Sequence, residues 1–118
     1  MKLTTTLHTF FDHYLTGIKG VNQNTVKAYR DVMKLFLPFA ARYHGIQIAS
    51  LTLEHLSSEL ILAFLNHLEG KRGNITNTRN QRLAVLKSFA KMMCFLYPQY
   101  KETAEKILRI PQKRIQRK

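Results

Sequence analysis

The chain is short of acidic residues. Its 118 residues include 19 Lys or Arg but only 7 Asp or Glu, which gives a formal net charge of +12 and a pI near 10.2. Such an excess makes the folded chain repel itself, so it indicates a polyanionic partner. Nucleic acid is the first expectation and an anionic membrane surface the second; a chain that is basic only for solubility is the third alternative.

Cysteine and long apolar runs are also scarce. The single Cys94 cannot form an internal disulfide, and we expect a buried thiol in a reducing compartment. The sequence contains no run of 18 apolar residues, which is about the length that a membrane-spanning helix needs. Residues 1–9 lack the apolar core of a signal peptide. The sequence shows no β alternation, low complexity or repeat, so we expect one all-α domain.

Sequence patterns that indicate catalysis or metal binding are missing as well. The five histidines include no pair at i, i+4, and neither HExxH, CxxC nor an EF-hand spacing occurs. The five glycines are scattered rather than gathered in a phosphate-binding loop, and the few carboxylates form no pair suited to acid–base work. We therefore expect no metal, no cofactor and no enzyme activity from this chain alone.

What the sequence does contain is helical periodicity. Apolar residues recur at i, i+3, i+4 and i+7 in five segments, which predicts a compact bundle of four helices with a short fifth. Asn22, Ser57 and Thr76 are the expected N-caps, and Gly45 and Gly70 the expected C-terminal stops. The inward sets are Leu7, Phe10, Phe11, Tyr14, Leu15 and Ile18; Val26, Tyr29, Val32, Met33, Phe36, Phe39, Ala40 and Tyr43; Ile61, Phe64, Leu65 and Leu68; Leu83, Leu86, Phe89, Ala90, Met93 and Leu96; and Ala104, Ile107 and Leu108.

Three segments lie outside this bundle pattern. Residues 46–56 have no clear period and read as a connection containing about one helical turn, and "GKRGN" after Glu69 reads as a loop that carries Lys71 and Arg72. The last eight residues hold four bases and no acid. We expect a helical domain over residues 1–110 and an extended basic linker over 111–118.

Two helices are expected to carry basic faces. At about 100° per residue, Lys27, Arg30 and Lys34 stand opposite the apolar stripe of the second helix. Between Glu69 and Glu102 lie seven Lys or Arg and no acid. Opposite the apolar stripe of the fourth helix the wheel places Asn77, Asn80, Gln81, Ala84, Lys87, Ser88 and Lys91.

Such a face suits DNA. Amides and long bases read base edges in a major groove, while hydroxyls and helix N-termini bind phosphates. The alternative is a solvated surface, but solvated helices usually intersperse charges of both signs. Arg79 and Arg82 fall beside the apolar stripe, where each pairs with an acid such as Glu59 or Glu69 or reaches back to a phosphate; both alternatives stay open.

Four stretches, "NQNTVKAYRDVMKLFLPFA", "LSSELILAFLNHLE", "NTRNQRLAVLKSFAKMM" and "ILRIPQKR", resemble in order and spacing the N-terminal core-binding, SAM-like domain of tyrosine recombinases, the phage-integrase and Xer-like family. The resemblance covers nearly the whole chain. It implies a helical domain that clamps one face of duplex DNA, with the second and fourth helices across the major groove, and other recombinase protomers as partners. The family's nucleophilic Tyr and its His-x-x-Arg pair belong to a second domain and have no counterpart here, so this chain is expected to be the DNA-binding part of a longer recombinase.

The residues that match the family's DNA-contacting helices are Asn24, Thr25, Lys27, Tyr29 and Arg30, then Thr78, Asn80, Arg82 and Lys87. Lys87 stands where the family usually has Arg, and Tyr29 lies on the apolar stripe. The DNA-binding residues we predict are Asn24, Thr25, Lys27, Arg30, Lys34, Lys71, Arg72, Thr76, Asn77, Thr78, Asn80, Gln81, Ala84, Lys87 and Lys91, with Asn80 and Lys87 reading bases, and Lys27, Arg30, Lys34 and Lys91 contacting phosphates.

Two other functions remain open from the sequence. One is a standalone helical DNA-binding protein, such as a repressor or an architectural factor. The other is a protein-interaction bundle whose basic tail contacts a membrane or an acidic partner. No small-molecule substrate is expected under any of these interpretations.

Overall fold

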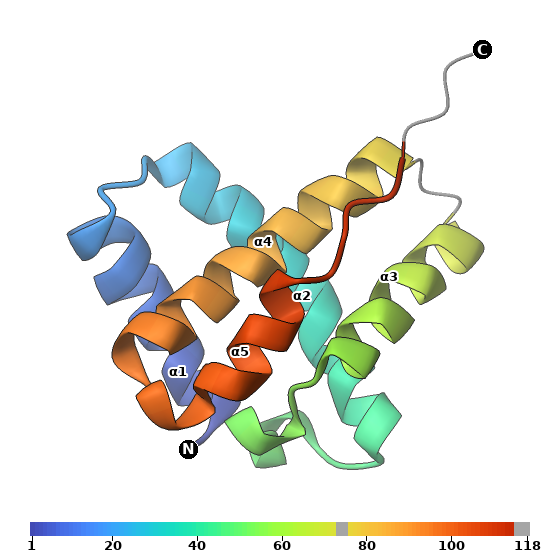
Figure 1. Ribbon diagram of the computed structural model, residues 1–118, viewed down its shortest axis with the longest axis horizontal. Helices are drawn as coiled ribbons and strands as arrows, with labels where there is room; N and C mark the ends of the chain where they lie inside the picture. The colour runs from blue at the N-terminus through green and yellow to red at the C-terminus, as the bar shows by residue number, and fades with distance from the viewer. Residues whose placement is uncertain (73–75, 115–118) are drawn as a thin grey trace. The chain divides into compact units, whose positions relative to one another are not determined.

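This computed structural model describes residues 1–72 and 76–114, with the backbone alone at 71 and 72, and the regular secondary structure of these residues is helical (Figure 1). No strand occurs in these ranges, where Lys2 and Thr52 form an isolated β-bridge. No helix within them is long and apolar enough to cross a membrane. The all-α prediction is confirmed. The chain divides into two compact units, Met1–Leu56 and Ser57–Lys118, and the predicted boundary at residue 110 stays a prediction.

The first helix changes type along its length. It begins as α1 (Leu3–Thr9) and continues as the π-helix η1 (Phe10–Ile18), where the Lys19 N–H donates to the Tyr14 carbonyl at 2.9 Å, five residues back. A π-helix has a wider turn than an α-helix, so the apolar spacing drifts off the predicted stripe. Leu7, Phe10, Tyr14 and Leu15 are buried as predicted and Phe11 is half-buried, but Ile18 is 46% exposed and its inward placement is wrong.

The second helix, α2 (Gln23–His44), has both of its predicted ends. The Asn22 side chain accepts a hydrogen bond from the Thr25 N–H at 2.9 Å, which is an N-cap. Gly45 follows with a φ of 67°, the left-handed conformation that ends helices. Of the predicted inward set, four residues are buried, three are half-buried (Tyr29, Val32 and Phe39), and one is exposed; the buried ones are Val26, Met33, Phe36 and Ala40. Tyr43 is 50% exposed in the last turn of the helix, so its inward placement is wrong.

The connection after α2 contains two short 3-10 turns rather than one, η2 (Ile48–Ser50) and η3 (Leu53–His55). The start of the chain binds to this segment: the Leu3 N–H donates to the Leu51 carbonyl at 2.9 Å, and the Leu53 N–H donates to the Met1 carbonyl at 3.0 Å. Leu51, Leu53 and Leu56 are buried. Apolar anchors therefore hold a segment that lacks helical periodicity.

The second unit contains α3 (Ser58–Arg72), α4 (Thr76–Leu96), the 3-10 turn η4 (Pro98–Tyr100) and α5 (Lys101–Leu108). The Ser57 hydroxyl caps α3 by accepting from the Leu60 N–H at 3.0 Å, as predicted. Gly70 does not stop this helix, which continues to Arg72, so the loop predicted at residues 70–72 is wrong there. A glycine without a left-handed φ can stay inside a helix at a modest cost in propensity.

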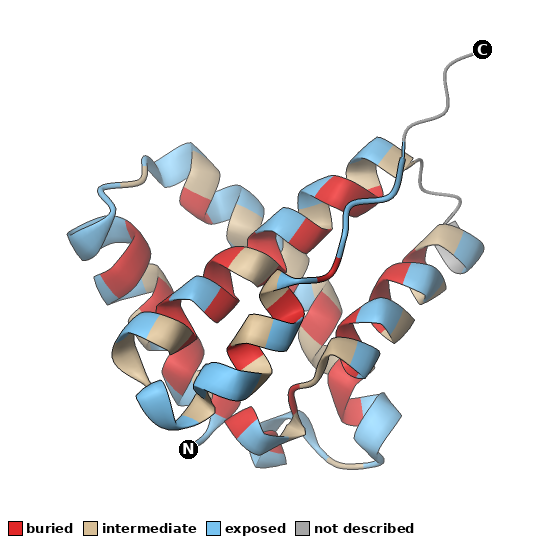
Figure 2. Cartoon of the chain, viewed as in Figure 1, coloured by how far each residue is buried: buried red, intermediate tan, exposed pale blue. Residues whose placement is uncertain are grey.

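Within this unit α3, α4 and α5 pack against one another (Figure 1). The predicted inward sets of these helices are buried except for Leu96 and Leu108, which are half-buried at the ends of their helices. Figure 2 colours the buried residues of the chain red. After α5 the chain has no regular secondary structure over residues 111–114, and the predicted linker stays a prediction. Residues 115–118 lie outside the described part of the chain.

Candidate nucleic-acid interface

The outward face of α4 is the strongest candidate site. From Thr76 to Leu96 the helix carries four Lys or Arg and no acid. Asn77, Gln81, Ala84 and Lys91 are exposed and Lys87 is half-buried. These five side chains, which we call the α4 face, combine amide donors and acceptors, a small residue and two ammonium groups, the chemistry that a DNA groove accepts.

Ser88 is not part of this face, because it is buried at 6% exposure. It lies three residues after Val85 and four before Met92, and both of these apolar side chains are also buried. Because α4 packs against both α3 and α5, it has a second buried stripe. A wheel that assumes a single apolar stripe places Ser88 on the wrong side.

Asn80 was also wrongly predicted to be exposed. It is 8% exposed, and both ends of its amide are engaged by the tail. Its Nδ2 donates to the Lys113 carbonyl at 2.9 Å, and the Lys113 N–H donates to its Oδ1 at 2.9 Å. A side chain that is buried and bound on both its donor and its acceptor side is not available to read a base, so we remove Asn80 from the DNA-contacting set.

Glu69 at the end of α3 joins the same network. Its Oε1 lies 2.8 Å from Arg79 Nε, and its Oε2 accepts from Lys113 Nζ at 3.0 Å. The Arg79 side chain is only 9% exposed, so of the two alternatives left open by the sequence it takes the acid partner. Arg82 is half-buried. Removing an arginine from such a pair leaves a poorly solvated carboxylate behind, which gives this ion pair a structural role.

The start of α4 is partly covered. Thr76, predicted as its N-cap, is the first helical residue, and the position before it lies outside the described residues. Thr76 and Thr78 are half-buried. The predicted contacts of Lys71 and Arg72 depend on side chains that also lie outside the described residues. The first turn of α4 contains no acid, so the positive end of the helix dipole is not neutralised from within the helix.

The cations predicted on α2 do face solvent. Lys27, Arg30 and Lys34 are exposed, and so is Asn24. Thr25 is half-buried and uses its N–H in the cap at Asn22. These groups belong to the first unit and add exposed cations to those of the α4 face, although the exposed Asp31 follows Arg30 directly.

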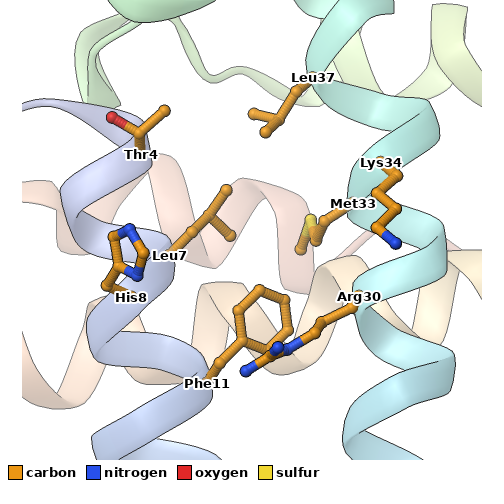
Figure 3. Close-up of a pocket in the computed structure, with 8 residues that line it drawn as sticks. All are labelled: Thr4, Leu7, His8, Phe11, Arg30, Met33, Lys34 and Leu37. Atoms are coloured by element: carbon orange, nitrogen blue, oxygen red, sulfur yellow. The ribbon is translucent and has the colours of Figure 1, made fainter.

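Arg30 differs from the two lysines because it is held in place. Its guanidinium carbon lies 5.1 Å from the centre of the Phe11 ring, and its Nη2 lies 3.7 Å from Asp12 Oδ1. Both side chains of this ion pair are more than half exposed, so the pairing is worth little in free energy. Figure 3 shows Arg30 beside Phe11 at the edge of a cleft of about 290 Å³ between α1, η1 and α2, with Lys34 and His8 also at the cleft and Leu7 and Met33 within it.

The described residues contain no group of three or more His, Cys, Asp or Glu side chains that would hold a metal ion. Cys94 is a free thiol that is half-buried, so the prediction of a buried thiol is wrong. The described geometry therefore offers charge and hydrogen-bonding groups to a partner but assembles no metal centre. One feature that the sequence did not reveal is the contact between Asn80 and Lys113, whose residues lie 33 positions apart.

Comparisons with known proteins agree with the resemblance found in the sequence. The family model described as phage integrase, N-terminal SAM-like domain, matches residues 9–94. Two proteins of Sinorhizobium fredii (strain NBRC 101917 / NGR234), whose names carry the provisional description integrase/recombinase, are similar to the chain. The protein y4rD is 39% identical over 108 residues, and y4rC is 32% identical over 111 residues.

These matches span 92% and 94% of the chain but only 38% and 33% of the two relatives. No solved structure matches the chain significantly. The family match begins at the last residue of α1 and ends within α4, so it contains all of α2 and the whole α4 face. The chain belongs to the N-terminal SAM-like domain family of phage integrases.

Proposed function

We propose that this domain binds duplex DNA as the core-binding domain of a tyrosine site-specific recombinase, and that it clamps one face of a recombination site during DNA integration or recombination. The α4 face enters a major groove, and the cations of α2 contact phosphates. Strand cleavage and rejoining would then be carried out by a further catalytic domain, and recombinase protomers would be the protein partners. We place the protein in the bacterial cytoplasm, at the nucleoid.

The observation that carries this proposal is the acid-free, solvent-facing side of α4. The helix exposes Asn77, Gln81, Ala84 and Lys91 and half-exposes Lys87, with no carboxylate between Thr76 and Leu96. A surface helix that served only solubility would gain from acids spaced three or four residues from its lysines. Without such acids a solvated helix loses this stabilisation, whereas a helix that faces phosphates has no use for acids, because phosphates would repel them.

The second support is the family. Its members y4rD and y4rC carry the description integrase/recombinase in their names, and they align with this chain over nearly all of its length. A basic surface on a bundle of this family suits a polyanion more closely than it suits an apolar partner. The exposed cations Lys27 and Lys34 add a second region of positive charge on α2.

The roles within the surface differ. Lys27, Lys34 and Lys91 are exposed point charges, which suits contacts with phosphates on any sequence. Lys87 is half-buried and lies on the same side of α4 as Ala84 and Lys91, which suits a more constrained contact with a base edge. Arg30 keeps its role as a phosphate contact, with its guanidinium already oriented by Phe11.

The experiment is a titration of the protein and its variants against a recombination-site duplex and a random duplex at two salt concentrations. Lys87→Ala should weaken binding to the preferred duplex more than to the random one, whereas Lys91→Ala should weaken both equally. Lys106→Ala, which removes an exposed cation from α5 next to Glu102, is the matched control. Vesicles of anionic lipid form a second arm: equal binding to vesicles and duplex would contradict the proposal and favour a membrane partner.

A further inference from the structure

The last described residues return along α4 instead of leaving the fold at the end of α5. Figure 1 shows the segment after α5 running beside α4 toward the end where α4 begins. Ile110 anchors its start, since it is 4% exposed. Lys113 anchors its end through both backbone hydrogen bonds to Asn80, while Pro111 and Gln112 between the anchors are exposed.

Asn80 fixes the backbone of the tail at Lys113, which goes beyond an attraction between charged side chains. The carboxamide of Asn80 has one donor group and one acceptor, and each binds the complementary group of the same residue at 2.9 Å. Two parallel hydrogen bonds to one residue restrict both the position and the direction of the chain. Glu69 adds a third contact through Lys113 Nζ at 3.0 Å, and Arg79 in turn holds Glu69 at 2.8 Å.

The residue after this contact is Arg114, which is exposed. The Lys113 ammonium is drawn toward Glu69, which it shares with Arg79, whereas Arg114 is the next residue of the tail and is exposed, so Arg114 is the described tail cation that we assign to a partner. A cation on a free tail must lose conformational freedom when it binds a phosphate. A cation whose preceding residue is already fixed loses less, so the same contact adds more to affinity.

We propose that Asn80 is a positioning residue for DNA binding: it clamps the backbone at Lys113 and thereby holds Arg114 beside the first turns of α4, where it contacts a DNA phosphate. This inference rests on the proposed function. In this proposal Asn80 does not read a base; it binds the tail, and the tail contacts DNA.

The clamp itself is tested without DNA. In amide hydrogen exchange, the Lys113 N–H of the parent protein should be protected, and Asn80→Ala should speed its exchange at least tenfold. Gln81→Ala, which removes the same type of side chain from the next, exposed position of α4, should leave that rate unchanged. Lys113→Ala keeps the backbone bonds and removes only the contact with Glu69, so it should raise the rate less than Asn80→Ala does.

The positioning role is tested by a double-mutant cycle on a duplex. In the parent, Arg114→Ala should lower affinity severalfold and reduce the slope of log K against log salt concentration by about 0.9. In the Asn80→Ala background the same substitution should have less than half that effect on log affinity, because the tail is no longer held. In the Gln99→Ala background, which removes an exposed carboxamide from η4 outside the proposed interface, the full effect of Arg114→Ala should remain.

The outcomes separate this proposal from the proposed function. If the parent does not bind duplex DNA at all, both fail. If the parent binds and the variants of Lys87 and Lys91 behave as expected, but the effect of Arg114→Ala is the same with and without Asn80, the positioning role is overturned while the proposed function stands. Unchanged exchange at Lys113 in Asn80→Ala would overturn the clamp whatever the binding data show; a melting curve for each variant excludes unfolding as the cause of faster exchange.

Discussion

The substitution Ala84→Glu tests the α4 face most directly, because it adds one negative charge at its centre. Ala84 is exposed, so a longer side chain has room there. A carboxylate about 6 Å from a phosphate, at an effective dielectric constant near 20, is repelled by roughly 3 kcal/mol before screening by salt. Allowing for screening, we expect a loss of about 2–3 kcal/mol, which is roughly a 30- to 150-fold rise in Kd.

The same change should not harm the fold. Exposed substitutions typically shift the free energy of unfolding by less than about 0.5 kcal/mol. Here the new carboxylate would also lie three residues before Lys87, a spacing at which opposite charges stabilise a helix by about 0.2–0.5 kcal/mol. Ala84→Glu should therefore lower the DNA affinity while the free energy of unfolding stays the same or rises slightly. This combination would distinguish a lost DNA contact from an unfolded protein.

The assay is fluorescence anisotropy with a labelled duplex at low and moderate salt, together with a thermal melt of each variant. Gln99→Glu adds the same charge at an exposed position in η4 and serves as the control. The control should lose affinity by no more than a few-fold, through net charge alone. If Ala84→Glu binds as the parent does, or loses no more than Gln99→Glu, the α4 face does not meet phosphates and the reasoning from its missing acids is wrong.

Four further predictions concern other parts of the chain. Asn22→Ala should reduce the free energy of unfolding by about 1 kcal/mol in urea titrations, because it removes the cap of the Thr25 N–H; an unchanged midpoint would contradict this. Arg79→Ala should reduce it by about 1–3 kcal/mol, since Glu69 keeps its charge and loses its closest partner; a Glu69→Gln, Arg79→Ala double variant that is no more stable than the single one would count against that cause. Lys34→Ala should weaken binding to specific and random duplexes alike and lower the salt slope by about 0.9, so a sequence-dependent loss would refute a pure phosphate contact. This chain alone should form no covalent adduct with a nicked recombination site on a denaturing gel, and a stable adduct would overturn the expectation that it carries no nucleophile for strand cleavage.

The helices were predictable because their signals are local. Asn22 and Ser57 cap through hydrogen bonds to residues three positions away, and Gly45 ends α2 through its own backbone conformation. Such features depend on a few neighbouring residues, which a sequence displays directly. Gly70 shows the limit of this approach, because a glycine marks a helix end only when the backbone there turns left-handed.

The errors on α4 come from contacts that no local pattern contains. Ser88 is buried because two helices of the second unit pack against α4, and the sequence does not show how many neighbours a helix has. Ile18 is exposed because η1 winds more widely than the assumed period. By contrast, Ala84, Gln81 and Lys91 were correctly placed toward solvent, since they lie farthest from both buried stripes.

Asn80 shows why amide side chains are ambiguous in a search for DNA contacts. A carboxamide places one donor next to one acceptor, and the adenine edge in the major groove offers the complementary pair. A peptide backbone offers the same pair through its N–H and its carbonyl, and here Lys113 supplies both. The chemistry of the residue therefore cannot decide between base and backbone; burial decides, because a base reader must be open to the groove before DNA arrives. Asn80 is buried at 8% exposure, whereas Gln81, which has the same functional group one position later, is exposed to solvent. If the domain binds DNA as proposed, the amides of the α4 face that are open to a base are therefore Gln81 and Asn77, and we expect Asn80 to act on DNA binding through the tail it holds.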